Sequence, residues 1–182
     1  ADFEAAADWL VAEGRTSRSR LAIRGGSNGG LLVAACMTRR PDLCAAVVCE
    51  VPLTDMVRFP RFLIARLWTD EYGDPDVPEE LQWLLGYSPY HHVKEGQGYP
   101  AILFMTADTD TRVDPMHAKK MAALMQARAA PDSEPAEPVP PTLPPTASDI
   151  APWGDTDIGA PAGPVPVFST RPAPKAEGDM PT

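Results

Sequence analysis

The sequence predicts an α/β fold, with a parallel sheet and crossover helices over residues 1–130 and a disordered proline-rich tail over residues 131–182. Two observations predict the sheet. Short apolar runs without polar alternation are followed by longer runs of helical periodicity, and a glycine-rich turn joins the first strand to its helix. A third observation predicts the tail: it holds 14 of the 22 prolines and few large apolar residues.

The first part of the chain alternates helix and strand. Residues 3–13 carry apolar side chains at helical spacing, and residues 21–24 form a short apolar strand. Residues 28–39 are expected to form a buried helix, which Pro41 prevents from continuing. Residues 45–50 are rich in β-branched side chains without alternation, which indicates a parallel strand buried on both faces.

The second part returns to the same pattern after an interruption. Residues 52–100 are expected to form an excursion of loops and short helices, with residues 79–85 as the clearest helix. Residues 101–106 are a continuous apolar strand, residues 107–114 a polar loop rich in carboxylates, and residues 115–129 a helix. The chemistry of such a fold is expected in the loops that follow the strands.

Charge and hydropathy exclude two classes of partner. The net charge of −9 argues against nucleic acid and against an anionic membrane surface, since both require a basic face. No apolar run approaches the roughly 18 residues of a membrane span. No signal peptide is visible at the start, and because the chain begins with Ala1 we expect that a natural amino terminus has been removed.

The three cysteines predict neither a disulfide framework nor a metal site. Cys36, Cys44 and Cys49 fall in apolar surroundings without metal-ligand spacing, so we expect small core residues and neither metal nor cofactor. Free thiols fit a reducing compartment. We expect a cytoplasmic location, with the periplasm as the alternative.

The glycine-rich turn predicts a nucleophile. Gly25 and Gly29 stand two residues before and two after Ser27, between a strand and a helix, as a nucleophile elbow requires. Such an elbow has strained backbone angles, so its neighbours must lack side chains, and it directs the amide of Asn28 at a developing oxyanion. We therefore expect Ser27 to be the nucleophile.

Glycine-rich turns between a strand and a helix also have other functions. A phosphate-binding loop needs Gly-Lys-Ser/Thr, whereas Leu31 and Leu32 follow here, and the spacing does not fit a dinucleotide fingerprint. A purely structural glycine turn is the remaining alternative.

A serine nucleophile needs a histidine base and a carboxylate that orients it. Asp108 and Asp110 lie in the loop after the last strand, where the acid is expected. The histidine should follow the acid. His117 does so, but the helix that leaves this loop is expected to carry it away from the serine, as a surface or interface residue. His91 and His92 precede the acid and are expected to cap a helix or to pack on the excursion.

Five separated motifs resemble, in order, the catalytic domain of the prolyl oligopeptidase family. The resemblance runs from about residue 1 to about residue 128. The motifs are Gly25-Gly-Ser-Asn-Gly-Gly, Arg40-Pro-Asp-Leu, Leu67-Trp-Thr-Asp-Glu-Tyr-Gly, Tyr87-Ser-Pro-Tyr-His and Asp108-Thr-Asp-Thr-Arg-Val-Asp-Pro-Met-His.

The resemblance implies an α/β-hydrolase domain, capped in the family by a β-propeller, and a serine peptidase that cuts short peptides after proline. It implies Ser27 as nucleophile and Asp110 as triad acid, with an oxyanion donor in the Asn28 amide. It also implies substrate-binding residues, namely Arg112 for the peptide and Trp68, Tyr72 and Val113 for the proline ring.

The same resemblance predicts parts that this sequence does not match. The propeller, the strand region that supplies a tyrosine as second oxyanion donor, and the carboxyl-terminal segment with the catalytic histidine have no counterpart here. We therefore expect little or no activity from this chain alone, and an unpaired sheet edge where the last strand of the family lies.

Two alternatives to this function remain. A general esterase or a dipeptidyl-type peptidase on the same fold is disfavoured by the residues of the proline pocket. An interaction segment is suggested by the Pro-x-x-Pro spacings in the tail, such as Pro138 to Pro141. Polyproline ligands usually carry a flanking basic residue, whereas Asp132, Glu134 and Glu137 flank this one.

Overall fold

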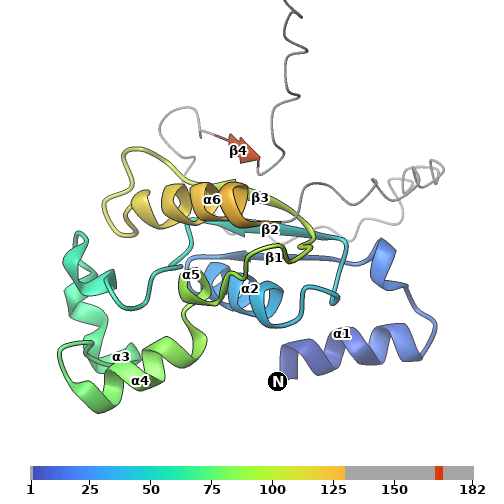
Figure 1. Cartoon of the computed structure of the whole chain (residues 1–182), viewed down its shortest axis with the longest axis horizontal. Coiled ribbons are helices and arrows are strands. Elements are labelled where there is room, and N and C mark those ends of the chain that lie inside the picture. The colour runs from blue at the N-terminus through green and yellow to red at the C-terminus, as the bar shows by residue number, and fades with distance from the viewer. Residues whose placement is uncertain (1, 130–166, 170–182) are drawn as a thin grey trace, which may run out of the picture.

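The computed structural model describes residues 2–129 and 167–169 of the 182-residue chain. It contains a sheet of order β1-β2-β3-β4. Strands β1 (Ala22–Gly26), β2 (Ala46–Glu50) and β3 (Ala101–Met105) are parallel, and β4 (Val167–Ser169) runs antiparallel beside β3 (Figure 1). The parallel sheet with crossover helices that the sequence predicts is confirmed.

The longer helices also agree with the sequence. Helix α2 (Asn28–Arg39) has the predicted bounds, α1 (Asp2–Ala12) and α6 (Met116–Arg128) differ by one residue at each end, and α4 (Pro78–Tyr87) extends the predicted helix at both ends. The excursion also contains short helical turns that the sequence did not place individually. Together with a turn before β1 they are η1 (Arg18–Arg20), η2 (Phe59–Arg61), η3 (Ala65–Trp68), α3 (Thr69–Tyr72) and α5 (Pro89–His92).

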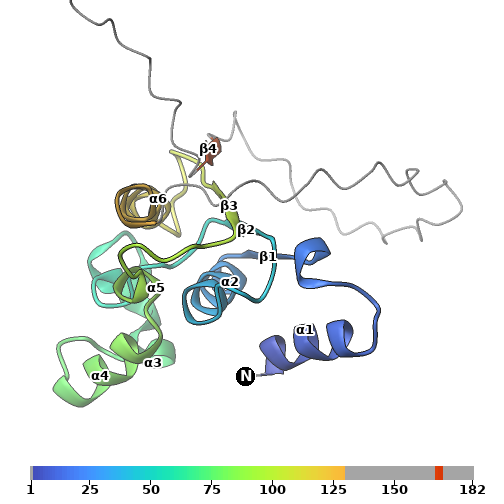
Figure 2. The ribbon, with the colours of Figure 1, turned by 45° about the vertical axis from the view of Figure 1, so that its right-hand side comes forward.

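One face of the sheet forms the main core. Ile23, Val47 and Ile102 are in register across the three parallel strands, so their side chains lie on the same face, and all three are buried. Residues of α2 and α6 pack in the same core cluster. Both views place α2, α5 and α6 on one side of the strands (Figures 1 and 2).

The opposite face is covered by no helix of the part that the structure describes. On β1 the residues of this face are exposed, while Val48 and Leu103, in the middle of β2 and β3, are half-buried. The prediction that β2 is buried on both faces therefore holds for one face within the described residues. The face of Val48 and Leu103 is called the open face below.

The three cysteines are buried, as the sequence predicts, and belong to the same core. Burial raises the pKa of each thiol, so all three stay protonated at neutral pH. The Cys49 thiol on β2 donates a hydrogen bond to the Gly30 carbonyl oxygen at 3.3 Å, which ties this strand to the first turn of α2. None of the helices described here is long and apolar enough to traverse a bilayer.

The sheet edge at β3 differs from its prediction. Leu103 pairs with Ser169 and Met105 with Val167, so β4 covers residues 103–105 of an edge that was expected to be unpaired. The predicted disorder of residues 131–182 and the polyproline spacings concern residues outside the described part, apart from the three of β4. At the other edge, no strand of the described ranges pairs with β1.

Candidate active site

Ser27 occupies a strained turn between β1 and α2. Its backbone angles are φ 55° and ψ −119°, a conformation that residues other than glycine rarely adopt. Two backbone hydrogen bonds hold the turn: the Ser27 amide donates to the Glu50 carbonyl oxygen at 2.9 Å, and the Leu31 amide donates to the Ser27 carbonyl oxygen at 3.1 Å. The side chain is exposed and makes no capping hydrogen bond to α2. The hydroxyl is therefore open to reagents in solvent.

The glycines around Ser27 serve this turn unequally. A Cβ atom on Gly25 would lie 2.1 Å from the Gly29 carbonyl oxygen, which confirms that a side chain is excluded there. A Cβ atom on Gly29 would meet nothing within 4 Å, so the same reason does not apply to that residue. Gly30 is required instead, because its Cβ would lie 2.9 Å from the Glu50 carbonyl oxygen and from Pro52. The excluded side chains are those at positions 25 and 30.

Asp110 lies in the loop after β3. Ser27 follows β1, so both residues lie at the carboxyl-terminal ends of the parallel strands. Its Oδ1 accepts the amides of Arg112 at 2.8 Å and Val113 at 3.0 Å, which closes a tight turn. Within residues 2–129 and 167–169 no hydrogen bond reaches its Oδ2. Asp108, the other candidate acid, is exposed and accepts from Lys119 at 2.7 Å instead. Asp110 is thus the carboxylate with an oxygen left to orient a base.

The order of the strands sets the spacing of these groups. Ser27 follows β1 and Asp110 follows β3, with β2 between them. Neighbouring strands are about 4.8 Å apart, so the two loops begin roughly 10 Å apart, measured across the strands at their carboxyl-terminal ends. The amide of Asn28, the first residue of α2, lies at the same end of the strands. This separation leaves room for a side chain as large as an imidazole ring between Ser27 and Asp110.

The structure gathers the three predicted pocket residues in one apolar cluster. Val113 is buried in it, and Trp68 and Tyr72 pack against it half-buried. Burial raises the pKa of the Tyr72 phenol, so this side chain stays uncharged. Leu31, one turn after the nucleophile on α2, belongs to the same cluster. The cluster thus reaches from the elbow into the excursion.

Sequence reasoning missed other members of this cluster. Leu53, Met56, Phe59 and Leu84 are all at most 2 % exposed and complete its interior. The ring of Phe59 meets that of Tyr72 edge to face, with 5.6 Å between centroids. The signal for Leu53, Met56 and Phe59 was weak, because apolar residues scattered through loops and short turns follow neither helical nor strand periodicity. Leu84 lies in α4, whose helix was predicted, but its place in this cluster was not.

Arg112 is exposed on the loop between Asp110 and Val113, with its backbone amide on the aspartate. The loop thus carries, within four residues, a carboxylate, an exposed guanidinium and a buried apolar side chain.

All three histidines of the chain make contacts away from Ser27. His117 is 1 % exposed, so the prediction of a surface or interface residue is wrong. Its Nδ1 accepts the amides of Thr54 and Asp55. The Nδ1 of His91 lies 2.9 Å from the Ser88 hydroxyl, and the Nε2 of His92 lies 2.7 Å from the Leu85 carbonyl oxygen.

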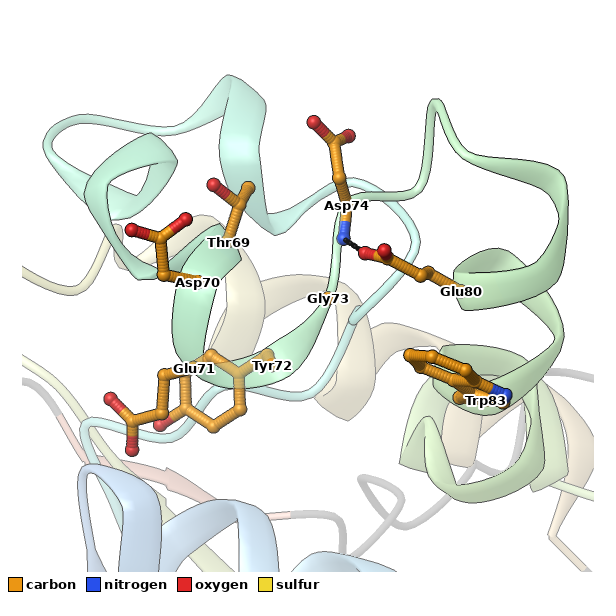
Figure 3. Close-up of a pocket in the computed structure, with 8 residues that line it drawn as sticks. All are labelled: Thr69, Asp70, Glu71, Tyr72, Gly73, Asp74, Glu80 and Trp83. Atoms are coloured by element: carbon orange, nitrogen blue, oxygen red, sulfur yellow. Dashed lines mark hydrogen bonds between the residues drawn. The ribbon is translucent and has the colours of Figure 1, made fainter.

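A hollow of about 380 Å³ lies between α3 and α4, and Tyr72 of the apolar cluster is one of its lining residues (Figure 3). Four carboxylates and two aromatic rings line it together with Thr69 and Gly73, and the Asp74 amide donates to Glu80 Oε2 across it at 2.6 Å. Ser27, Asp110 and Arg112 are not among its lining residues. In the described ranges, no group of three or more His, Cys, Asp or Glu side chains could hold a metal ion.

Known proteins resemble most of the described part of this chain. The sequence model described as the Prolyl oligopeptidase family matches residues 1–135. An uncharacterized peptidase of Sinorhizobium fredii is 52 % identical over 125 residues, which cover 69 % of this chain and 17 % of that protein. A prolyl oligopeptidase of Omphalotus olearius is 45 % identical over 127 residues, again 69 % of this chain and 17 % of the relative.

Solved structures of similar proteins share the fold of the described residues. The structure of a post-proline cleaving enzyme from Rickettsia typhi matches with a TM-score of 0.68 and 38 % identity, over 71 % of this chain and 19 % of that one. The chain therefore spans less than a fifth of the length of these relatives.

Proposed function

The chain belongs to the prolyl oligopeptidase family, and on that premise we propose that it carries the nucleophile, the acid and the proline pocket of a serine peptidase that cleaves short peptides after proline. The observation that carries the proposal is the backbone of Ser27, with φ 55° at the carboxyl end of β1. A non-glycine residue held in this conformation at the entry to a helix is costly, and a nucleophile elbow accounts for it.

In the proposed reaction the Ser27 hydroxyl oxygen attacks the carbonyl carbon of the substrate proline. The hydroxyl proton passes to a histidine, and the carbonyl oxygen takes up negative charge. The Asn28 amide donates to that oxygen at the start of α2. Return of the proton to the departing amine breaks the peptide bond and leaves an acyl-serine. Water then hydrolyses this ester by the same steps.

Asp110 is proposed to orient the histidine and to stabilise its charged form. Support comes from its turn, in which Oδ1 is held by two backbone amides at 2.8 and 3.0 Å while Oδ2 has no donor in the described ranges. Arg112, exposed two residues later, is proposed to donate to a carbonyl oxygen of the bound peptide.

The proline pocket is proposed to consist of Trp68, Tyr72 and Val113 with the buried residues around them. An aromatic face can stack on the flat pyrrolidine ring, and a pocket with walls of buried apolar side chains excludes polar side chains. We also propose that the substrate is a short peptide and that the whole protein contains a propeller and further catalytic parts. A cytoplasmic location is proposed as well.

The base is proposed to come from outside these 182 residues, because each histidine of the chain is engaged elsewhere. We therefore expect the isolated chain to react with a fluorophosphonate probe far more slowly than a complete serine peptidase, as loss of a triad member commonly costs about 10³-fold or more. Rapid labelling of Ser27, absent in Ser27→Ala, would contradict the need for an external base.

The pocket and the nucleophile can be tested together by acylation. The chain is incubated with the p-nitrophenyl ester of an N-blocked proline, with and without added imidazole as an external base, and the adduct is located by mass spectrometry. We expect acylation at Ser27, faster with imidazole, and faster than with the matched leucine ester or p-nitrophenyl acetate. Equal rates for all three esters would favour a general esterase. Equal acylation of Ser27→Ala would overturn the proposal.

A further inference from the structure

The segment between β2 and η2, residues 51–58, is irregular but mostly buried. Residues 52–56 are all buried, although they belong to no helix or strand. Buried backbone amides and carbonyls need hydrogen-bond partners, and a segment without a strand ladder must find them elsewhere. The partners of this segment therefore decide which position it adopts.

His117 on α6 provides the partners at the centre of the segment. Its Nδ1 lies 3.3 Å from the Thr54 amide and 3.2 Å from the Asp55 amide, so one unprotonated ring nitrogen is shared by two donors. Its carbonyl oxygen accepts the Thr54 hydroxyl at 2.7 Å. The ring is 1 % exposed and meets Phe62 edge to face, with centroids 5.2 Å apart. This single residue therefore contacts the segment through both its ring and its backbone.

Other contacts hold the two ends of the same segment. The Val51 amide donates to the Met105 carbonyl oxygen at 2.7 Å, and the Met56 amide donates to the Ser88 hydroxyl at 3.0 Å. The Asp55 carboxylate is paired with Lys120, one turn after His117 on α6. Helix α6 thus supplies both the acceptor for the central amides and the counter-charge beside them.

The amides that His117 accepts are flanked by two members of the apolar cluster. Leu53 immediately precedes Thr54, and Met56 immediately follows Asp55. Both side chains are at most 2 % exposed and lie in the cluster that contains Val113. Leu53 and Met56 are called the pocket wall below. A shift of the two amides would move the pocket wall, because the residues are adjacent in the chain.

We propose that His117 is a positioning residue of the peptide pocket, which holds the pocket wall in place by accepting the Thr54 and Asp55 amides. The inference rests on the proposed function for the pocket itself. It assigns His117 no contact with substrate and no part in proton transfer. The ring nitrogen acts through the segment, as a fixed acceptor.

The test compares two amide side chains at position 117 in the full chain. In His117→Asn the Oδ1 atom is one bond from Cγ, as Nδ1 is in histidine, so an acceptor remains near the two amides. In His117→Gln the amide group lies one bond further out and cannot replace Nδ1. Thr54→Val removes the hydroxyl donor from the opposite side of the contact and serves as a second variant if His117→Gln does not fold.

Two readouts separate the inference from the function on which it rests. The first is binding of N-acetyl-alanyl-proline amide, followed by Trp fluorescence. The second is the set of NMR signals of the Leu53 and Met56 methyl groups and of the Thr54 and Asp55 amides. We expect His117→Asn to keep the affinity of the unchanged chain within about twofold, and His117→Gln and Thr54→Val to weaken it about tenfold with displaced methyl signals.

Each outcome bears on the inference. Equal affinity and equal methyl signals in the Asn and Gln variants would overturn it, whether or not the pocket binds proline. If the unchanged chain does not bind the dipeptide, the proposed pocket fails. In that case displaced pocket-wall signals in His117→Gln, restored in His117→Asn, would still support the positioning role.

Discussion

At the scale of single residues, His117 is expected to make stability depend on pH. Burial lowers the pKa of its ring to about 4, although Asp55 and Asp114 act in the opposite direction, with a smaller lowering from Lys120. In the unfolded chain the pKa is close to 6.5. Between these values the unfolded state binds a proton that the folded state does not. The contribution of the neutral His117 to the free energy of unfolding is therefore complete above pH 6.5. It is lost as the pH falls toward 4, which lowers the free energy of unfolding by on the order of 3 kcal/mol.

The measurement is urea unfolding at pH 7.5, 5.5 and 4.5 for the unchanged chain and for His117→Asn, which cannot titrate at this position. The difference between the two curves isolates the histidine. Asp55 loses its contribution at lower pH, because its interactions with Lys120 outweigh burial and lower its carboxyl pKa. A difference that stays constant across the three pH values would contradict a neutral, buried His117.

The glycines of the elbow give a second prediction at this scale. Gly25→Ala places a Cβ atom 2.1 Å from the Gly29 carbonyl oxygen and is expected to cost about 3 kcal/mol or more, or to abolish folding. Gly29→Ala meets open space in the first turn of α2 and is expected to stabilise by about 0.5–1 kcal/mol. Thermal and urea unfolding of the pair would decide this, and equal effects would be incompatible with the described turn.

At the scale of elements, the contact between α6 and the 51–58 segment depends on a buried charge pair. Asp55 is fully buried, and the side chain of its partner Lys120 is 18 % exposed. Lys120→Met leaves the carboxylate with the exposed Arg58 guanidinium, at 3.7 Å, as its remaining cationic partner. The substitution is expected to cost as much as about 3–5 kcal/mol, of which the double variant with Asp55→Asn should recover a part. Lys119→Met is the matched control. Its exposed pair with Asp108 is worth less than about 1 kcal/mol. Similar losses in the free energy of unfolding for both lysine variants would contradict the greater importance of the buried pair.

The same elements show what the sequence could predict. The strands and α2 were predictable because apolar runs bounded by glycine and proline determine them, and the turn at Ser27 because a side chain at position 25 has no room. That glycine is needed at position 30 and not at position 29 depends on Glu50 and Pro52, which no local spacing indicates. The turns η2 and η3 contain three and four residues and show no periodicity. Val51 adopts φ 37° with a β-branched side chain, which nothing in the sequence indicates. The burial of His117 depends on amides 62 and 63 residues away in the chain.

At the scale of the whole molecule, the open face is expected to govern how the isolated chain behaves. Val47 and Val48 are neighbours on β2 with opposite directions: Val47 is 1 % exposed in the core, and Val48 is half-buried on the open face. Val47→Glu is expected to prevent folding, since an unpaired charge would enter the core. Val48→Glu is expected to leave the fold intact and to reduce self-association and binding of the dye ANS. Circular dichroism, light scattering and dye fluorescence would measure these effects, and equal tolerance of both substitutions would contradict the assigned core face.

Two backbone hydrogen bonds continue the sheet just beyond its strands, from the Ser27 amide to the Glu50 carbonyl oxygen and from the Val51 amide to the Met105 carbonyl oxygen. They connect the turn of Ser27, through β2, to the strand that leads into the loop of Asp110. Neither bond involves a side-chain atom. Side chains at positions 50, 51 and 105 can therefore be exchanged in the course of divergence without loss of the two bonds that fix the separation between Ser27 and the loop of Asp110.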